Sequence, residues 1–180
     1  MNLASAVEPG QMYQVASPAQ GLQAYIDNYW AVFPDEEGST VDLCVEVFAD
    51  ARADLIFNFG CAYLRQQPGH PTLQQQSSNL DAQRDYPIRI YQKGKVQIIG
   101  VRWRAGGLGA FMGDSLHRLS NQVWPLADVF GKAALALEDN LRSQPQDFSI
   151  VLDGFWLERL QLSKPYEQFC QIKDSLEACH

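Results

Sequence analysis

Histidine, serine and cysteine most often carry catalysis or bind metal, and here none of them occurs in a recognised arrangement. His70, His117 and His180 have no second histidine, cysteine or carboxylate at a metal-ligand spacing. No serine lies in a G-x-S-x-G turn, and the four cysteines form no C-x-x-C pair. The sequence therefore predicts no enzyme of these classes, no metal site and no cofactor.

Two arginines have an unusual position on an otherwise apolar strand. Between residues 96 and 104 the alternation of side chains places Arg102 and Arg104 on one face together with apolar residues. A guanidinium group in such a place must reach solvent or pair with an anion. This strand is therefore the first candidate for a functional site.

Two interpretations of these arginines stay open. In the first, one of them forms an internal ion pair with Asp54, which lies near Asn58 on another apolar strand. In the second, they line a pocket for a small ligand beside Trp103 and Tyr91. An arginine in that pocket would favour an anionic or hydrogen-bond-accepting ligand. The predicted ligand-binding residues are Arg102, Arg104, Trp103, Tyr91, Asp54 and Asn58.

The first part of the chain has the alternating pattern of β-strands. Alternation predicts strands over residues 41–48 and 53–59. Strand signals return over 87–91 and 95–104, and Lys93-Gly94 between them predicts a β-hairpin. Residues 65–85 hold six glutamines and few large apolar residues, which predicts a long surface loop.

The second part has helical spacing. Gly106-Gly107 predicts a tight exit from the last strand, with a positive φ angle, into helical structure. A helix is expected over 126–141 after Pro125, and another after Asp147. Strands followed by helices predict an α+β fold. A last segment, 163–180, carries an apolar stripe that we interpret as an interface, formed by Tyr166, Phe169, Ile172 and Leu176.

Composition limits the classes of function. The 180 residues are 46% hydrophobic and carry a net charge of −7, which indicates a globular chain that repels phosphate. This excludes tight binding of nucleic acid by this chain alone. No apolar run approaches the roughly 18 residues of a membrane span, and the first ten residues lack the pattern of a signal peptide. We expect a soluble, cytoplasmic protein that does not bind membranes.

Four segments together resemble the N-terminal domains of AraC-type bacterial transcriptional regulators. They are LQAYIDNYW (22–30), ADLIFNFG (53–60), IGVRWRAGGL (99–108) and LADVFG (126–131). The last three resemble the "DLIF", "GVRFRPGG" and "L.DLFG" elements of that group. The likeness covers about residues 20 to 162, with the segments in the same order.

The resemblance implies an architecture. It implies a cupin-like β-barrel or sandwich over residues 1–107 and a helical region packed on it over 108–162. Residues 163–180 would begin a truncated helix that leads to an absent helix-turn-helix domain. The implied function is a regulatory domain that senses a small molecule or a partner and controls DNA binding by the absent domain. A homodimer is the expected assembly.

Two other functions remain as alternatives. One is a metal-free cupin-like binding protein or isomerase, and the other is a protein-interaction domain without a ligand.

Overall fold

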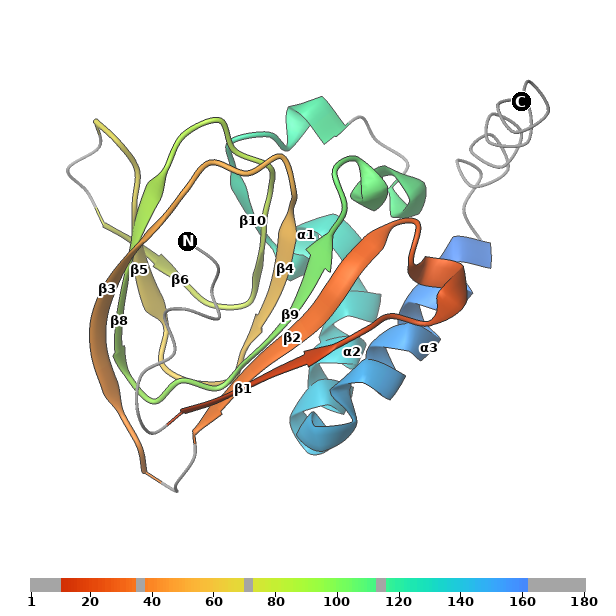
Figure 1. Cartoon of the computed structure of the whole chain (residues 1–180), viewed down its shortest axis with the longest axis horizontal. Helices are drawn as coiled ribbons and strands as arrows, with labels where there is room; N and C mark the ends of the chain where they lie inside the picture. The colour runs from red at the N-terminus through yellow and green to blue at the C-terminus, as the bar shows by residue number, and fades with distance from the viewer. Residues whose placement is uncertain (1–10, 35–37, 70–72, 113–115, 162–180) are drawn as a thin grey trace.

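A computed structural model describes residues 11–34, 38–69, 73–112 and 116–161 of the chain. In these ranges two antiparallel sheets are followed by a helical part, which confirms the predicted α+β class (Figure 1). The interface residues Tyr166, Phe169, Ile172 and Leu176 lie outside the described residues.

The larger sheet has six strands and the smaller has four. The first runs in the order β1 (Gln11–Ala16), β2 (Ile26–Pro34), β9 (Ile98–Trp103), β4 (Asp54–Asn58), β7 (Asn79–Asp81) and β10 (Val123–Pro125). The second runs in the order β3 (Val41–Val47), β8 (Ile88–Gly94), β5 (Tyr63–Gln66) and β6 (Gln74–Gln76). Over the described ranges, neither sheet closes on itself.

The central strands of the larger sheet are covered on both faces. In β2, Tyr29, Ala31 and Phe33 pack into the core beneath the helices. Trp30 and Val32, which alternate with them, belong to a separate apolar cluster between the sheets. This alternation follows from the two-residue period of a strand. As a result, the six-stranded sheet lies between the helices on one side and the smaller sheet on the other (Figure 1).

The helical part consists of α1 (Leu126–Phe130), α2 (Lys132–Ser143) and α3 (Phe148–Gln161). Single 3₁₀ turns occur at Gln20–Leu22, Gly107–Phe111, Leu116–Arg118 and Pro145–Asp147. The single helix predicted over 126–141 is divided at Gly131, whose φ of +64° does not continue an α-helix. The predicted positive φ at Gly106 is confirmed, with a value of +75°.

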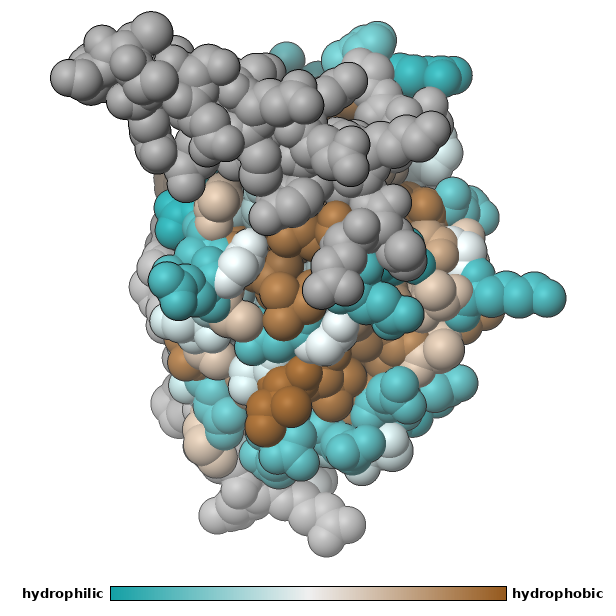
Figure 2. Space-filling view, turned by 90° about the vertical axis from the view of Figure 1, so that its right-hand side faces the viewer, coloured by the Kyte–Doolittle hydropathy of each residue, from teal (hydrophilic) through white to brown (hydrophobic). Residues whose placement is uncertain are grey.

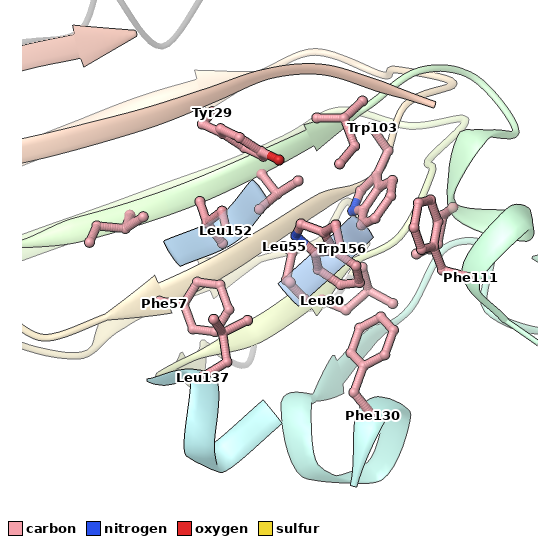
Figure 3. Close-up of a cluster of buried hydrophobic side chains, with 14 of the residues drawn as sticks. Tyr29, Leu55, Phe57, Leu80, Trp103, Phe111, Phe130, Leu137, Leu152 and Trp156 are labelled. Atoms are coloured by element: carbon pink, nitrogen blue, oxygen red, sulfur yellow. The ribbon is translucent and has the colours of Figure 1, made fainter. Parts of the chain in front are cut away.

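The main core lies between the larger sheet and the helices (Figure 3). Its centre is Trp156 of α3, whose ring packs edge-on against Trp103 at 4.7 Å and Phe111 at 5.3 Å between centroids. Asp153 of α3 also accepts hydrogen bonds of 2.9 Å from the Tyr29 hydroxyl and the Ala19 amide. These contacts fix α3 against β2 and β9.

Two loop predictions were wrong. Strands β8 and β9 form no hairpin, because they belong to different sheets and the chain crosses between them with Val96 buried in the sandwich. The predicted surface loop at 65–85 contains β6, β7 and the end of β5. The glutamine-rich strand β6 forms because it pairs with β5, a tertiary contact that composition does not reveal.

The side of the molecule on which the helices lie has apolar surface between hydrophilic residues (Figure 2). In α3, Ile150 is 71% exposed. Among the described residues, no helix has the length and apolar character needed to cross a membrane.

Candidate functional site

A cavity of about 110 Å³ lies between the two sheets. Its walls are mostly apolar on the side of β3 and β8, and polar where β4, β7 and β9 run side by side. The lining residues are Trp30, Val32, Leu43, Val45, Val47, Asp54, Ile56, Tyr63, Asp81, Arg84, Ile90, Gln92, Val96, Ile98 and Arg102. The interior of a sheet sandwich is ordinarily filled by interdigitating side chains, so charged groups and free space there require a reason.

The polar side of the cavity is a row of residues paired across the sheet. Asn28 of β2 is opposite Arg102 of β9, which is opposite Asp54 of β4, and Asp54 is opposite Asp81 of β7. Directly opposed residues on one face of a sheet have side chains close enough to interact. The register of four strands therefore brings these groups together from distant parts of the sequence.

The Arg102–Asp54 pair is bidentate. Arg102 donates from Nε to Asp54 Oδ1 and from Nη2 to Oδ2, both at 2.9 Å. Burial acts to lower the pKa of Arg102, but the hydrogen bonds and charge of Asp54 outweigh it and raise the pKa. The predicted internal ion pair is thus present, and both of its members also line the cavity.

Asp81 is shared by two arginines. Its Oδ1 lies 3.4 Å from Arg65 Nη2, and its Oδ2 lies 3.3 Å from Arg84 Nε. Burial raises the pKa of Asp81 and the nearby Asp54 adds to the rise, whereas Arg84 and Arg65 oppose it. Arg65 reaches this group from β5 of the opposite sheet, so the charged cluster connects the two sheets.

The polar end of the cavity adjoins a wider hollow of about 410 Å³. The two spaces share Asp54, Arg84 and Arg102 in their walls. Further out, Arg52 pairs with Asp50 at 2.8 Å and with Asp27 at 3.2 Å. The charged residues in the shared wall therefore border both the cavity and this polar hollow.

A larger hollow of about 530 Å³ lies elsewhere, beside residues 66–69 and 87–89. Its charged lining residues, Glu46 and Arg89, are exposed and pair with each other at 3.5 Å. Because these charges are solvated and already paired, this hollow is the weaker candidate despite its size.

The structure separates the six residues predicted to bind a ligand. Arg102 and Asp54 line the cavity. Trp103, the next residue on β9, faces the helices and packs on Trp156. The Tyr91 hydroxyl donates to Gln66 Oε1 at 3.1 Å, on the face of β8 directed away from the cavity.

Arg104 and Asn58 also lie outside the cavity lining. Arg104 follows the end of β9 and is half exposed; its Nε donates to the Gln23 carbonyl and its Nη1 lies 3.6 Å from Asp27. The Asn58 side chain shapes the turn after β4, where it donates to the Cys61 carbonyl and accepts from the Gly60 amide. In these positions the two side chains fix local backbone.

The other charged groups at or beside the cavity were not predicted from the sequence. Arg65, Asp81 and Arg84 all fall in the segment that was predicted to be a surface loop. A signal was present, since Tyr63 and Arg65 alternate with Leu64 as strand residues do. Over the parts of the chain that the structure describes, no group of three or more His, Cys, Asp or Glu residues could hold a metal ion.

A family described as a domain of unknown function, DUF6597, matches residues 14–125. The chain belongs to this family. The DUF6597 match takes in every residue that lines the cavity and ends just before α1. The cavity is therefore part of the DUF6597 region itself, while helices α1 to α3 follow it. Searches of curated proteins and of solved structures found no match.

Proposed function

We propose that this chain is a regulatory domain that binds a small molecule between its two sheets and controls an attached helix-turn-helix domain. The observation that carries the proposal is the cavity, which has an apolar wall and a charged wall inside the sandwich. Binding sites for small molecules combine these properties, namely apolar lining and a few polar groups that orient the ligand.

The strand order supports a cupin-like fold for this domain. Along the chain, β2, β4, β7 and β9 join the larger sheet, and β3, β5, β6 and β8 form the smaller. With the edge strands β1 and β10 of the larger sheet left aside, this alternation of eight strands between two facing sheets supports a double-sheet jelly roll, the architecture of cupins. The likeness to AraC-type regulatory domains leads to the same expectation.

Strand β9 contacts both the cavity and the helices, so it could couple ligand binding to the packing of the helices. Arg102 faces the cavity, and the adjacent Trp103 packs on Trp156 of α3. A ligand that displaces Arg102 would act on the packing of α3 through one strand. Such a ligand regulates only if it binds two arrangements of the domain with different affinity.

The first experiment is a thermal-shift screen of small organic molecules on the chain and on Val45→Phe, which places a ring in the cavity. Compounds that act as proposed should raise the melting temperature of the wild type and of Ile150→Phe, an exposed control, but leave that of Val45→Phe unchanged. If no compound distinguishes Val45→Phe from the control, there is no ligand site between the sheets.

The second experiment tests regulation. The chain is fused to a helix-turn-helix domain that represses a reporter only as a dimer, and the compound found in the screen is added. The proposal predicts a change of reporter output that Val45→Phe abolishes. Binding without any change in output would contradict the regulatory role.

A further inference from the structure

The buried charges around the cavity do not balance. Three arginines, Arg65, Arg84 and Arg102, face two carboxylates, Asp54 and Asp81, and the five side chains are 1% to 19% exposed. Arg102 occupies both oxygens of Asp54. Asp81 alone serves both Arg65 and Arg84. Asp27 and Asp50 lie further out with Arg52 and are 28% and 34% exposed. Among the deeply buried groups, arginines therefore outnumber carboxylates by one, and a buried charge is costly unless it is paired.

The hydrogen-bonding groups show the same deficit. Arg65 is 1% exposed, and its Nε and Nη1 have no hydrogen-bond partner among the described residues. Trp30, which lines the cavity, also has a buried Nε1 without a partner there. These three groups are all donors, so an acceptor placed beside them would satisfy them. Asn79 Oδ1 is an unpartnered acceptor, and neither Asn79 nor Arg65 is itself among the residues that line the cavity.

Arg65 does not line the cavity itself, but its guanidinium group contacts a residue that does. It is on the same face of β5 as Tyr63, a lining residue, because the two are separated by one position on the strand. Its Nη2 contacts Asp81, another lining residue, which leaves the remaining two nitrogens of the guanidinium group free of protein acceptors. Arg84 reaches the same carboxylate from the side of the polar hollow.

The apolar wall sets the size of the rest of the ligand. A cavity of about 110 Å³ is comparable with the roughly 150 Å³ of an engineered apolar cavity that binds benzene. Val45, Ile56 and Ile90 supply apolar contacts. The available space therefore fits a group about the size of one ring, with its polar end at the row of charges.

From these observations, and resting on the proposed ligand site, we propose that the ligand is a small organic carboxylate with an apolar body about the size of one aromatic ring. Its carboxylate lies at the Asp81 end of the row, where it accepts hydrogen bonds from Arg65 and Arg84. The apolar body lies against the walls formed by β3 and β8.

The probes for this proposal are benzoate and two neutral analogues of similar shape, benzamide and benzyl alcohol, measured by calorimetric titration at neutral pH. Because hydrogen bonds between charged groups are about twice as strong as neutral ones, benzoate should bind roughly tenfold more tightly than benzamide. Arg65→Met should remove this preference. Arg89→Met, on the exposed face of β8, should retain it.

Asp81→Asn tests the same charge balance by a change that should increase the affinity for benzoate. It removes a carboxylate that competes for the same arginines, so benzoate should bind several-fold more tightly than to the wild type. This variant gives an answer even if Arg65→Met does not fold.

The outcomes separate this inference from the proposed function. Equal affinity for benzoate and benzamide, or weaker binding of benzoate to Asp81→Asn, would overturn the carboxylate inference and leave the cavity as a site for neutral ligands. Binding of a neutral library compound in the cavity, with no binding of benzoate, would also overturn the carboxylate inference. If neither the probes nor any screened compound binds, both proposals fail.

Discussion

The Arg102–Asp54 ion pair should couple strongly, because it is both bidentate and buried. The two side chains are 13% and 19% exposed and are joined by two hydrogen bonds of 2.9 Å. Removing one member of such a pair leaves the other buried without a counter-charge, which costs about 3–5 kcal/mol. We expect Asp54→Asn and Arg102→Met each to lower the free energy of unfolding by roughly 3 kcal/mol. The double variant should lower the free energy of unfolding by much less than the sum of the two single losses.

A double-mutant cycle by urea denaturation measures this coupling. The pair Lys93–Asp42 is the matched control, since it also joins paired strands, at 3.1 Å, but its side chains are 82% and 75% exposed. The coupling of an exposed pair should stay below about 1 kcal/mol. If the Arg102–Asp54 coupling is no larger than that of the control, the charged row contributes nothing specific and our interpretation of the cavity wall is wrong.

Three further predictions concern the sheet, the pH dependence and the helices. A Cβ atom on Gly100 would lie 2.1 Å from Trp30 Cε2, so Gly100→Ala should cost about 1–3 kcal/mol through overpacking and shift tryptophan fluorescence; an unchanged urea midpoint would contradict this. Burial raises the pKa of Asp81, so the folded state holds the proton of the Asp81 carboxyl group more tightly than the unfolded state does. The free energy of unfolding should therefore fall as pH rises from the ordinary Asp range through the raised pKa. Asp81→Asn should flatten that slope in urea titrations at several pH values, and equal slopes would refute the shift. Leu152→Ala, at a fully buried site in α3, should cost about 2–5 kcal/mol, whereas Ile150→Ala should change the thermal midpoint little; similar effects of the two would contradict the packing of α3.

Strands with regular alternation could be predicted from the sequence, and those that depend on partners could not. The strands β3 and β4 are confirmed close to their predicted bounds, because their apolar residues repeat with period two. Strand β6 consists of three glutamines, and only its pairing with β5 makes it a strand. The hairpin was inferred from a turn at Gly94, but a turn sequence does not determine whether the next strand joins the same sheet.

The ion pair in the site was predictable from the sequence, because a single arginine on an apolar strand required one acidic partner. Arg102 on an apolar strand required an anion, and Asp54 was the nearest candidate by type and position. Adjacent residues on a strand point to opposite faces, so Trp103 could not share a pocket with Arg102. The inward face of β8 was not evident from the sequence, because that face includes the polar Gln92 while Tyr91 is directed outward.

The position of β9 in the larger sheet also determines when the protein can fold. This strand lies between β2 and β4, and Trp30 pairs with Gly100, far along the chain. Sheets dominated by such distant pairings fold slowly, in milliseconds to seconds. During synthesis, β2 and β4 must wait with unpaired edges until residues 98–103 leave the ribosome, and unpaired strand edges promote aggregation. Truncated chains that end before this strand should therefore be insoluble when expressed.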